Sequence, residues 1–143
     1  MEALDLTKRP PRSPRETLPG LDVLMIARTV DKLRATLPGG NLGDYKIPGF
    51  SGRLLQGLGI DESEMRDAVA AAANDGEVAA WVAAHTDVSR FPAVNAALLA
   101  PTIASRLDDA EWLAKYPIAK RLPRETALVD FLILDDEAAF AKS

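Results

Sequence analysis

The chain has 143 residues and no cysteine, and its formal net charge is −4. This length is close to the commonest domain size and favours one domain, while a hydrophobic content of 48% excludes a disordered chain. Without cysteine the chain can hold no disulfide, no thiolate nucleophile and no cysteine-ligated metal.

The charge is unevenly divided along the chain. Residues 1–53 carry nine basic and six acidic side chains, whereas residues 54–143 carry eight basic and fifteen acidic ones. The first part is net positive and the second net negative, so the two parts are expected to attract each other. The N-terminus lacks the apolar core of a signal peptide, and no apolar run is long enough to span a membrane. These features predict a soluble cytoplasmic protein.

The first twenty residues are predicted to form an extended arm. In the stretch LDLTKRPPRSPRETLPG, Pro10, Pro11 and Pro14 remove backbone donors and force the residues before them toward extended geometry. Polyproline II is the expected local conformation. We expect residues 1–20 to pack as an arm on a single helical domain of residues 21–143.

The hydrophobic period then changes to that of a helix. Apolar residues recur at helical spacing from Val23 to Leu37. Asp22 is the expected N-cap of this first helix, and the PGGN turn at residues 38–41 is the expected stop. The LGDYKIPGF stretch at residues 42–50 is expected to form a loop.

More short helices are expected beyond this loop. In chain order they lie at residues 51–58, 61–72, 78–85, 92–99, 109–116 and 126–134, with a last one after Asp136. Ser51 and Asp61 are expected N-caps, and Pro92 suits the first turn of its helix. The FLIL run at residues 131–134 also fits a short buried strand, but its flanks favour helix. No alternating segment of useful length appears, so we predict an all-α fold, a compact bundle of about six to eight short helices.

Three acidic clusters fall where helices are expected to start, at residues 61–64, 108–111 and 135–137. Asp61 with Glu64, and Asp108 with Glu111, have the spacing of a capping box. We therefore interpret the clusters as helix caps, and we predict no metal site and no cofactor. The single histidine, at position 85, is expected in the last turn of its helix, where an imidazolium suits the negative end of the helix dipole.

The basic arm is the most distinctive candidate for a binding site. Arg12 and Arg15 are three residues apart, so in polyproline II they point the same way, and paired guanidiniums suit a carboxylate or phosphate. The candidate anion-binding residues come from the arm, the first helix and the loop after it: Arg12, Arg15, Arg28, Asp31, Lys32, Arg34 and Tyr45. Few aromatic residues lie nearby for base stacking, which disfavours nucleic acid as a partner. A purely structural alternative is that the arm pairs its arginines with carboxylates of its own chain or of a neighbouring one.

The chain also resembles a known family in three stretches of its N-terminal half: LDLTKRPPRSPRETLPG, DKLRATLPGGNLGDY (31–45) and LGIDESE (58–64). These are similar to the uncharacterised, largely bacterial family catalogued as domain of unknown function 5069, and VNAALLAP and FLILDDE resemble its C-terminal half more loosely. The resemblance implies a small single-domain helical protein and no particular activity. The chain departs from the family pattern after Tyr45, where KIPGF replaces an aromatic-Pro-Cys type of step.

Three functional hypotheses follow from the residues. The first is a small non-enzymatic binding protein whose arm and first helix hold a small anion or an acidic segment of a partner. The second is a small enzyme that uses arginine, aspartate and tyrosine side chains on an anionic metabolite, with Asp31, Asp44 and Tyr45 as candidates. The third is an interaction subunit, or a homodimer in which the arms are exchanged between protomers. No membrane partner is predicted.

Overall fold

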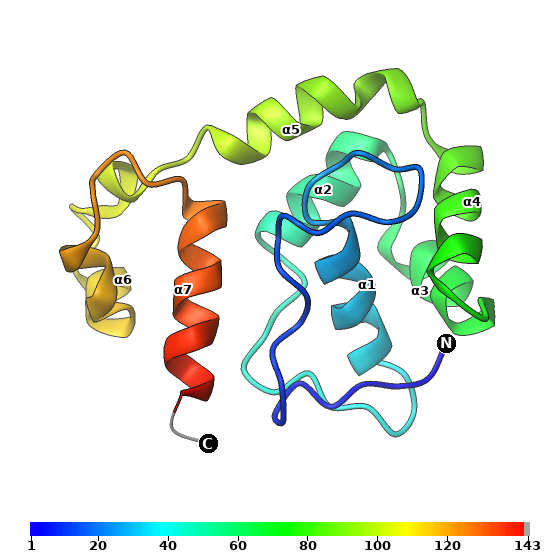
Figure 1. Cartoon of the computed structure of the whole chain (residues 1–143), viewed down its shortest axis with the longest axis horizontal. Coiled ribbons are helices and arrows are strands. Elements are labelled where there is room, and N and C mark those ends of the chain that lie inside the picture. Colours follow the sequence, from blue (N-terminus) through cyan, green and yellow to red (C-terminus); the bar gives the residue numbers. More distant parts are fainter. Residues whose placement is uncertain (142–143) are drawn as a thin grey trace.

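The computed structural model describes residues 1–141, and these form a helical bundle with an extended N-terminal segment (Figure 1). The α-helices are α1 (Ile26–Ala35), α2 (Phe50–Leu58), α3 (Glu62–Ala71), α4 (Asp75–His85), α5 (Phe91–Leu99), α6 (Ala110–Lys115) and α7 (Leu128–Phe140). Three short 3-10 helices lie between them: η1 (Val88–Arg90), η2 (Ile103–Arg106) and η3 (Pro117–Arg121). Within residues 1–141 only isolated β-bridges occur and no strand. The predicted all-α fold of six to eight short helices is therefore confirmed. Residues 142 and 143, the end of the expected domain, lie outside the described part.

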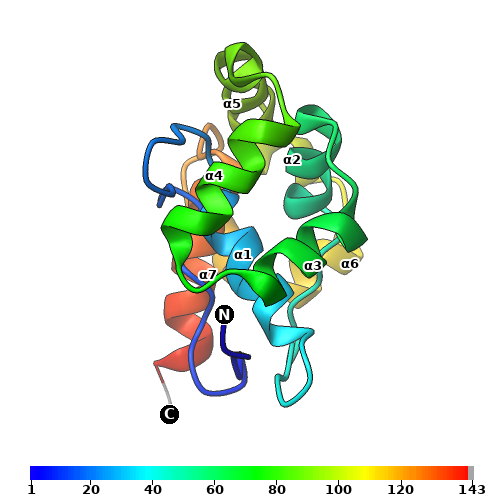
Figure 2. The same ribbon diagram turned by 90° about the vertical axis from the view of Figure 1, so that its right-hand side faces the viewer.

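Helix α1 occupies the centre of the molecule. Figures 1 and 2 show α2, α3 and α4 around it on one side and α7 on the other, while the N-terminal segment crosses its remaining face. Nine of its ten residues are buried. The polar side of α1 is thus covered as well as its apolar side. Because buried polar groups are costly without partners, this helix must find its hydrogen bonds within the protein.

The core has one large cluster of apolar side chains and two small ones. The large cluster contains residues from each of the five helices α1, α2, α3, α4 and α5, and Val129 of α7 also belongs to it. A second cluster, with Ile103 and Phe131 among its members, lies under α6, η3 and α7. Phe50 packs against both clusters. Helix α7 contributes Val129 to the large cluster and Phe131 to the second one, so it lies between the main body and the C-terminal part of the fold.

The start of α1 differs from the prediction. The helix begins at Ile26 instead of close to Val23, and Met25 at its N-cap position has a left-handed backbone with φ of 70° and no side-chain cap. Asp22 is therefore not a cap. The segment before α1 is instead bound to α5, because the Leu24 backbone N–H donates a hydrogen bond of 2.8 Å to the side-chain oxygen of Asn95. Spacing along the chain cannot show a hydrogen bond supplied by a distant helix.

Ser51 is also not a cap. Helix α2 begins one residue earlier, at Phe50, and Ser51 lies inside it, fully buried. Its hydroxyl oxygen accepts a hydrogen bond of 2.9 Å from the Thr29 hydroxyl of α1. This serine joins two helices at a position where a larger side chain would separate them.

Asp61 caps α3 as predicted, because its side chain accepts a hydrogen bond from the Glu64 backbone. In the second acidic cluster Asp109, and not Asp108, is the cap of α6. The prediction was wrong for the third cluster. Residues 135–137 lie in the interior of α7, which runs without a break through the FLIL run and the acidic residues that follow. No separate helix starts after Asp136.

The helices of residues 1–141 are short relative to the thickness of a lipid bilayer. Among those of residues 1–141, none combines the length and the apolar character that crossing a membrane requires.

Candidate functional site

The N-terminal arm is fastened to the body by backbone hydrogen bonds and apolar contacts. The Leu6 backbone N–H donates to the Asn41 carbonyl at 2.8 Å, and the Asn41 N–H donates to the Leu4 carbonyl at 2.9 Å. Leu4 and Leu6 pack on Ala35 at the end of α1. The arm therefore forms a layer over α1, and its arginines are brought to defined positions.

Arg12 joins the arm to two elements of the body. Its guanidinium donates to both oxygens of Asp31 in α1 at 3.1–3.2 Å, and to Asp75 at the start of α4 at 2.6 Å. The Arg12 backbone N–H also donates to Asp31, at 2.8 Å. One arginine is thus shared by two carboxylates, a geometry that suits the planar fork of donors on a guanidinium.

Arg15 points to a different part of the molecule. Its Nε and Nη2 donate to the two oxygens of Asp130 in α7, at 2.8 and 2.9 Å, and the pKa of Asp130 is lowered chiefly by this hydrogen bond. Arg12 and Arg15 therefore bind separate carboxylates. The two guanidiniums do not point toward one shared anion, contrary to what the polyproline II spacing suggests.

Arg28 lies in the interior, on the side of α1 that faces α7. Its side chain is 2% exposed, and Nη1 donates to the Asp136 carboxylate at 2.7 Å. The Tyr45 hydroxyl donates to the other oxygen of the same carboxylate at 2.7 Å. The guanidinium also lies over the Tyr45 ring, 5.5 Å from its centroid. A helix, a loop and the C-terminal helix thus meet at one buried carboxylate.

Lys32 lies one turn after Arg28 on α1 and is also buried. Its ammonium donates to the Lys46 carbonyl at 2.9 Å, and no carboxylate within residues 1–141 lies within ion-pair distance. Burial, and then the charge of Arg28, lower the pKa of Lys32 to about 8. Two cations therefore share one helix face, and only one of them has a carboxylate partner.

We call Arg28, Lys32, Tyr45 and Asp136 the α1–α7 cluster. Burial is the main cause that raises the pKa of the Tyr45 hydroxyl, and its hydrogen bond to Asp136 adds to this effect. Burial and the neighbouring charge of Asp136 likewise raise the pKa of Asp135. The buried Nε of Arg28 has no hydrogen-bond acceptor within residues 1–141. The cluster thus has more cationic donors than acceptors to receive them.

The remaining predicted residues lie at the edge of this arrangement. Arg34 donates to the Glu2 carbonyl at 2.7 Å and lies 3.9 Å from Asp31. Asp44 is exposed, and Asp31 and Tyr45 bind different partners. Side-chain contacts therefore join Arg12, Asp31 and Arg34 in one group and Arg28 and Tyr45 in another. The two groups are linked by Arg28, whose Nη1 donates to the Arg12 carbonyl at 3.3 Å.

Sequence reasoning did not identify three acidic residues that complete the site: Asp75, Asp130 and Asp136. One signal for Asp136 was available, because Val129, Leu132 and Asp136 follow helical spacing, and the first two pack on the main core. Continuing the apolar period of FLIL through the acids places Asp136 on the buried face. No such pattern marks Asp75 or Asp130, since both lie on exposed or half-exposed turns of their helices.

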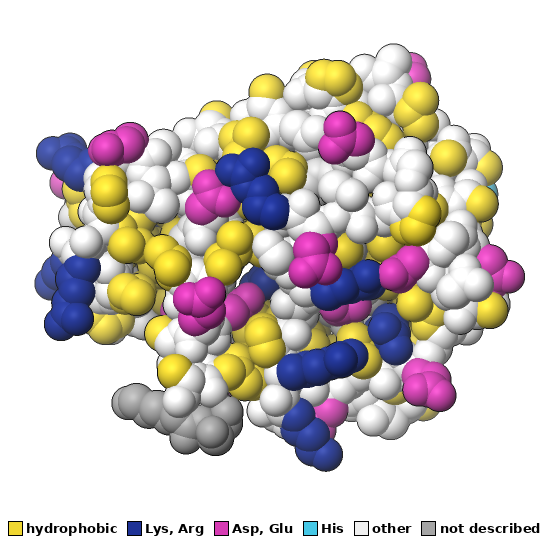
Figure 3. Space-filling view, in the orientation of Figure 1, with side chains coloured by type: hydrophobic (Ala, Val, Ile, Leu, Met, Phe, Trp, Pro, Cys, Tyr) yellow, Lys and Arg dark blue, Asp and Glu magenta, His cyan; other side chains and the backbone are white. Residues whose placement is uncertain are grey.

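On the face in Figure 3, basic and acidic side chains lie next to each other and do not gather into a patch of one sign. Within residues 1–141, no three acidic or histidine side chains are grouped in a way that could hold a metal ion. His85 lies in the last turn of α4 and stacks on Trp81, with ring centroids 4.1 Å apart.

The fold and the site define a small all-α protein whose extended N-terminal arm and central helix are joined to the other helices by ion pairs. The family model described as domain of unknown function (DUF5069) matches residues 8–137, and the chain therefore belongs to this family. That description assigns no activity. No curated protein matches the chain in sequence.

Proposed function

We propose that the protein is a non-enzymatic binding protein for a small anion, and that the α1–α7 cluster holds this ligand. The observation that carries the proposal is the surplus of buried donors. Arg28 Nε has no acceptor within the described chain, and the Lys32 ammonium has one carbonyl in place of a carboxylate. Buried cationic groups normally have a charged partner, because leaving them unpaired costs free energy.

The arginines of the arm in the predicted site already have carboxylate partners, so the proposed ligand site is limited to the α1–α7 cluster. Arg12 and Arg15 bind carboxylates of their own chain and act as fasteners of the arm. An acidic segment of a partner would have to displace these contacts, whereas a small anion needs only space beside Lys32. Tyr45 lies in the loop that covers the cluster, and that loop and α7 are the elements between which a ligand would enter.

The enzymatic alternative receives no comparable support. General acid–base chemistry needs groups within hydrogen-bond reach of each other. Asp31 is held by Arg12, Tyr45 is held by Asp136, and Asp44 is exposed.

The proposal is tested by thermal unfolding and titration calorimetry with acetate, oxalate and inorganic phosphate at constant ionic strength. A ligand that prefers the native state raises its stability, so at least one of these anions should raise the unfolding temperature of the natural protein. Lys32→Met should abolish the shift. Lys46→Met is the matched control, because Lys46 is exposed and contributes only its backbone carbonyl. Equal shifts in both variants would mean that the anions act at the surface and would contradict the proposal.

A further inference from the structure

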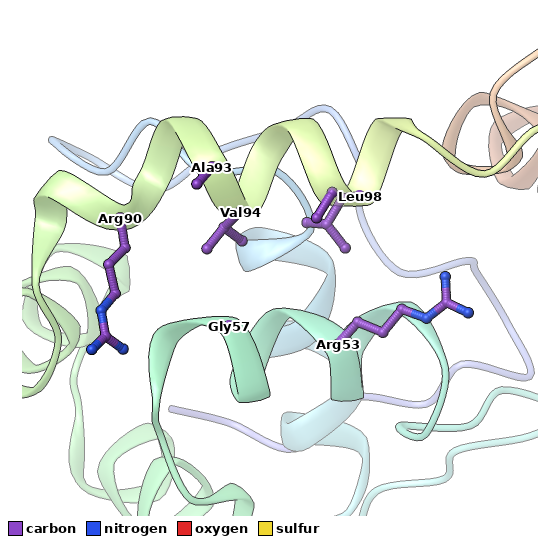
Figure 4. Close-up of a pocket in the computed structure, with 7 residues that line it drawn as sticks. Arg53, Gly57, Arg90, Ala93, Val94 and Leu98 are labelled. Carbon is purple, nitrogen blue, oxygen red and sulfur yellow. The ribbon is translucent and has the colours of Figure 1, made fainter.

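A second candidate site lies between α2 and α5. There the structure forms a groove of about 430 Å³, within the range of small-molecule sites, roughly 300–1,000 Å³. Figure 4 shows α5 crossing above α2, with Val94 and Leu98 pointing into the space between them. Ala93, Ala97 and Gly57 complete the apolar lining. Val94 and Leu98 are buried core residues, and Val94 packs against Gly57. These residues form the apolar floor of the groove, and the exposed Ala93 and Ala97 lie along its side.

Both ends of this groove carry an arginine. Arg53 extends from α2 at one end and Arg90 from η1 at the other, as Figure 4 shows. Neither has an ion-pair partner within residues 1–141, and no acidic side chain lines the groove. This differs from the arm, where Arg12 and Arg15 are each bound to carboxylates. Arg53 lies over the Phe50 ring, 5.3 Å from its centroid, and among the described residues its charge is not balanced by a carboxylate in contact with it.

The two ends are not equivalent. The Arg90 guanidinium lies beside Gly59, the residue that ends α2, where a cation already suits the negative end of the helix dipole. Arg53 also lines a second hollow of about 340 Å³, together with Ser105 and Arg106. Arg106 has only a long, exposed contact of 3.8 Å with Asp109. A polar, cationic hollow thus continues the apolar groove at the Arg53 end.

We propose that this groove binds a single-chain amphiphile with an anionic head group, such as a fatty carboxylate. The chain lies in the groove along Ala93 and Ala97, over the floor formed by Gly57, Val94 and Leu98, and the head group is bound by Arg53 and Arg106. Apolar burial contributes affinity in proportion to the area covered, and the guanidiniums supply charge-assisted hydrogen bonds to the head group. An acidic helix of a partner would match the charge, but a stable protein interface needs roughly 800 Å² on each side, more surface than a groove of this size offers.

The test uses dodecanoate below its micelle-forming concentration, measured by titration calorimetry with the full chain. We expect binding, at least about tenfold weaker binding of the uncharged dodecanol, and a similar loss on Arg53→Gln. Ala97→Phe should block the groove, because Ala97 is exposed and its side chain adjoins the apolar lining. Circular dichroism and thermal unfolding show whether each variant is folded.

Arg121→Gln is the matched control, since Arg121 is exposed, lies outside the groove and also lacks an ion pair among the described residues. It should leave dodecanoate binding unchanged. Absence of binding, equal binding of dodecanol, or full binding by folded Ala97→Phe protein would overturn the proposal. A larger loss with Arg90→Gln than with Arg53→Gln would overturn the assigned position of the head group. Dimerisation through the groove, seen as sedimentation of a dimer that Ala97→Phe disrupts, would replace the amphiphile with a second copy.

Discussion

Arg28 and Asp136 form a buried ion pair of 2.7 Å between residues 108 positions apart in the chain. The pair joins the central helix to the C-terminal helix, and the Tyr45 hydroxyl binds the same carboxylate. Three ion pairs connect a basic residue of residues 1–53 to an acidic residue of residues 54–143: Arg12–Asp75, Arg15–Asp130 and Arg28–Asp136. The asymmetry of charge along the sequence predicts this attraction, and the structure shows which residues carry it.

Removing one partner of the buried pair should destabilise the fold strongly. Asp136→Asn or Arg28→Met leaves a buried charge without its counterion, and we expect a loss of about 3–5 kcal/mol in the free energy of unfolding. Urea denaturation measures this loss. Glu62→Gln is the control, because the Arg66–Glu62 pair is largely exposed and should contribute less than about 1 kcal/mol. Equal losses in both cases would contradict a buried role for Arg28.

The two arginines of the arm should differ in their contributions. Arg12 is bound to Asp31, which is 6% exposed, and to Asp75, so Arg12→Ala should cost about 2 kcal/mol. Arg15 and Asp130 are 47% and 38% exposed, and Arg15→Ala should cost less than about 1 kcal/mol. Urea denaturation at low and high salt distinguishes the contributions of the two arginines to the free energy of unfolding, because added salt screens the exposed Arg15–Asp130 pair more. The reverse order of losses would show that Asp31 is not the main attachment of the arm.

Lys32 should make stability depend on alkaline pH. Its pKa in the folded protein is about 8, below the value of about 10.4 in an unfolded chain. Between these values the unfolded state binds more protons, so the Lys32 contribution becomes more favourable as pH rises, by about 3 kcal/mol in total. The difference in unfolding free energy between Lys32→Met and the natural protein, measured from pH 7 to pH 10, isolates this effect. A difference that does not vary with pH would contradict the lowered pKa.

Tyr45→Phe tests the hydroxyl in the α1–α7 cluster. Loss of its hydrogen bond to Asp136 should cost about 1–2 kcal/mol at neutral pH. Because the pKa of Tyr45 is raised in the folded protein, the unfolded state releases this proton first, and stability falls above about pH 10. The phenylalanine variant should lack this part of the alkaline loss. Urea denaturation at pH 7 and at pH 11 measures both effects, and identical pH profiles would refute the assignment.

The arm should fold back on its own chain. Its arginines find carboxylates within the same chain, so sedimentation equilibrium of the full chain should give a monomer. Deletion of residues 1–17 should leave a monomer of lower stability, because the polar face of α1 is then uncovered. A full-length dimer that dissociates on this deletion would instead support exchange of arms between protomers.

The sequence by itself determined most of the α-helical segments and the extended segment. Helical spacing of apolar residues, the cap at Asp61 and the proline in the first turn of α5 are local features, and they predict local structure correctly. Prolines of the arm likewise exclude helix over their own stretch. The family resemblance was also available from the sequence.

Only the tertiary structure decided how these elements are joined. Asp135, Asp136 and Glu137 have the composition of a helix start, yet they lie inside α7 because the packing of Val129 and Leu132 on the core continues the helix through them. The choice of Asp136 as partner of Arg28 depends on the distance between residues that are remote in the chain. Periodicity reports relations over about four residues. Ion pairs, the hydrogen bond from Leu24 to Asn95 and the groove between α2 and α5 depend instead on where whole helices come to lie.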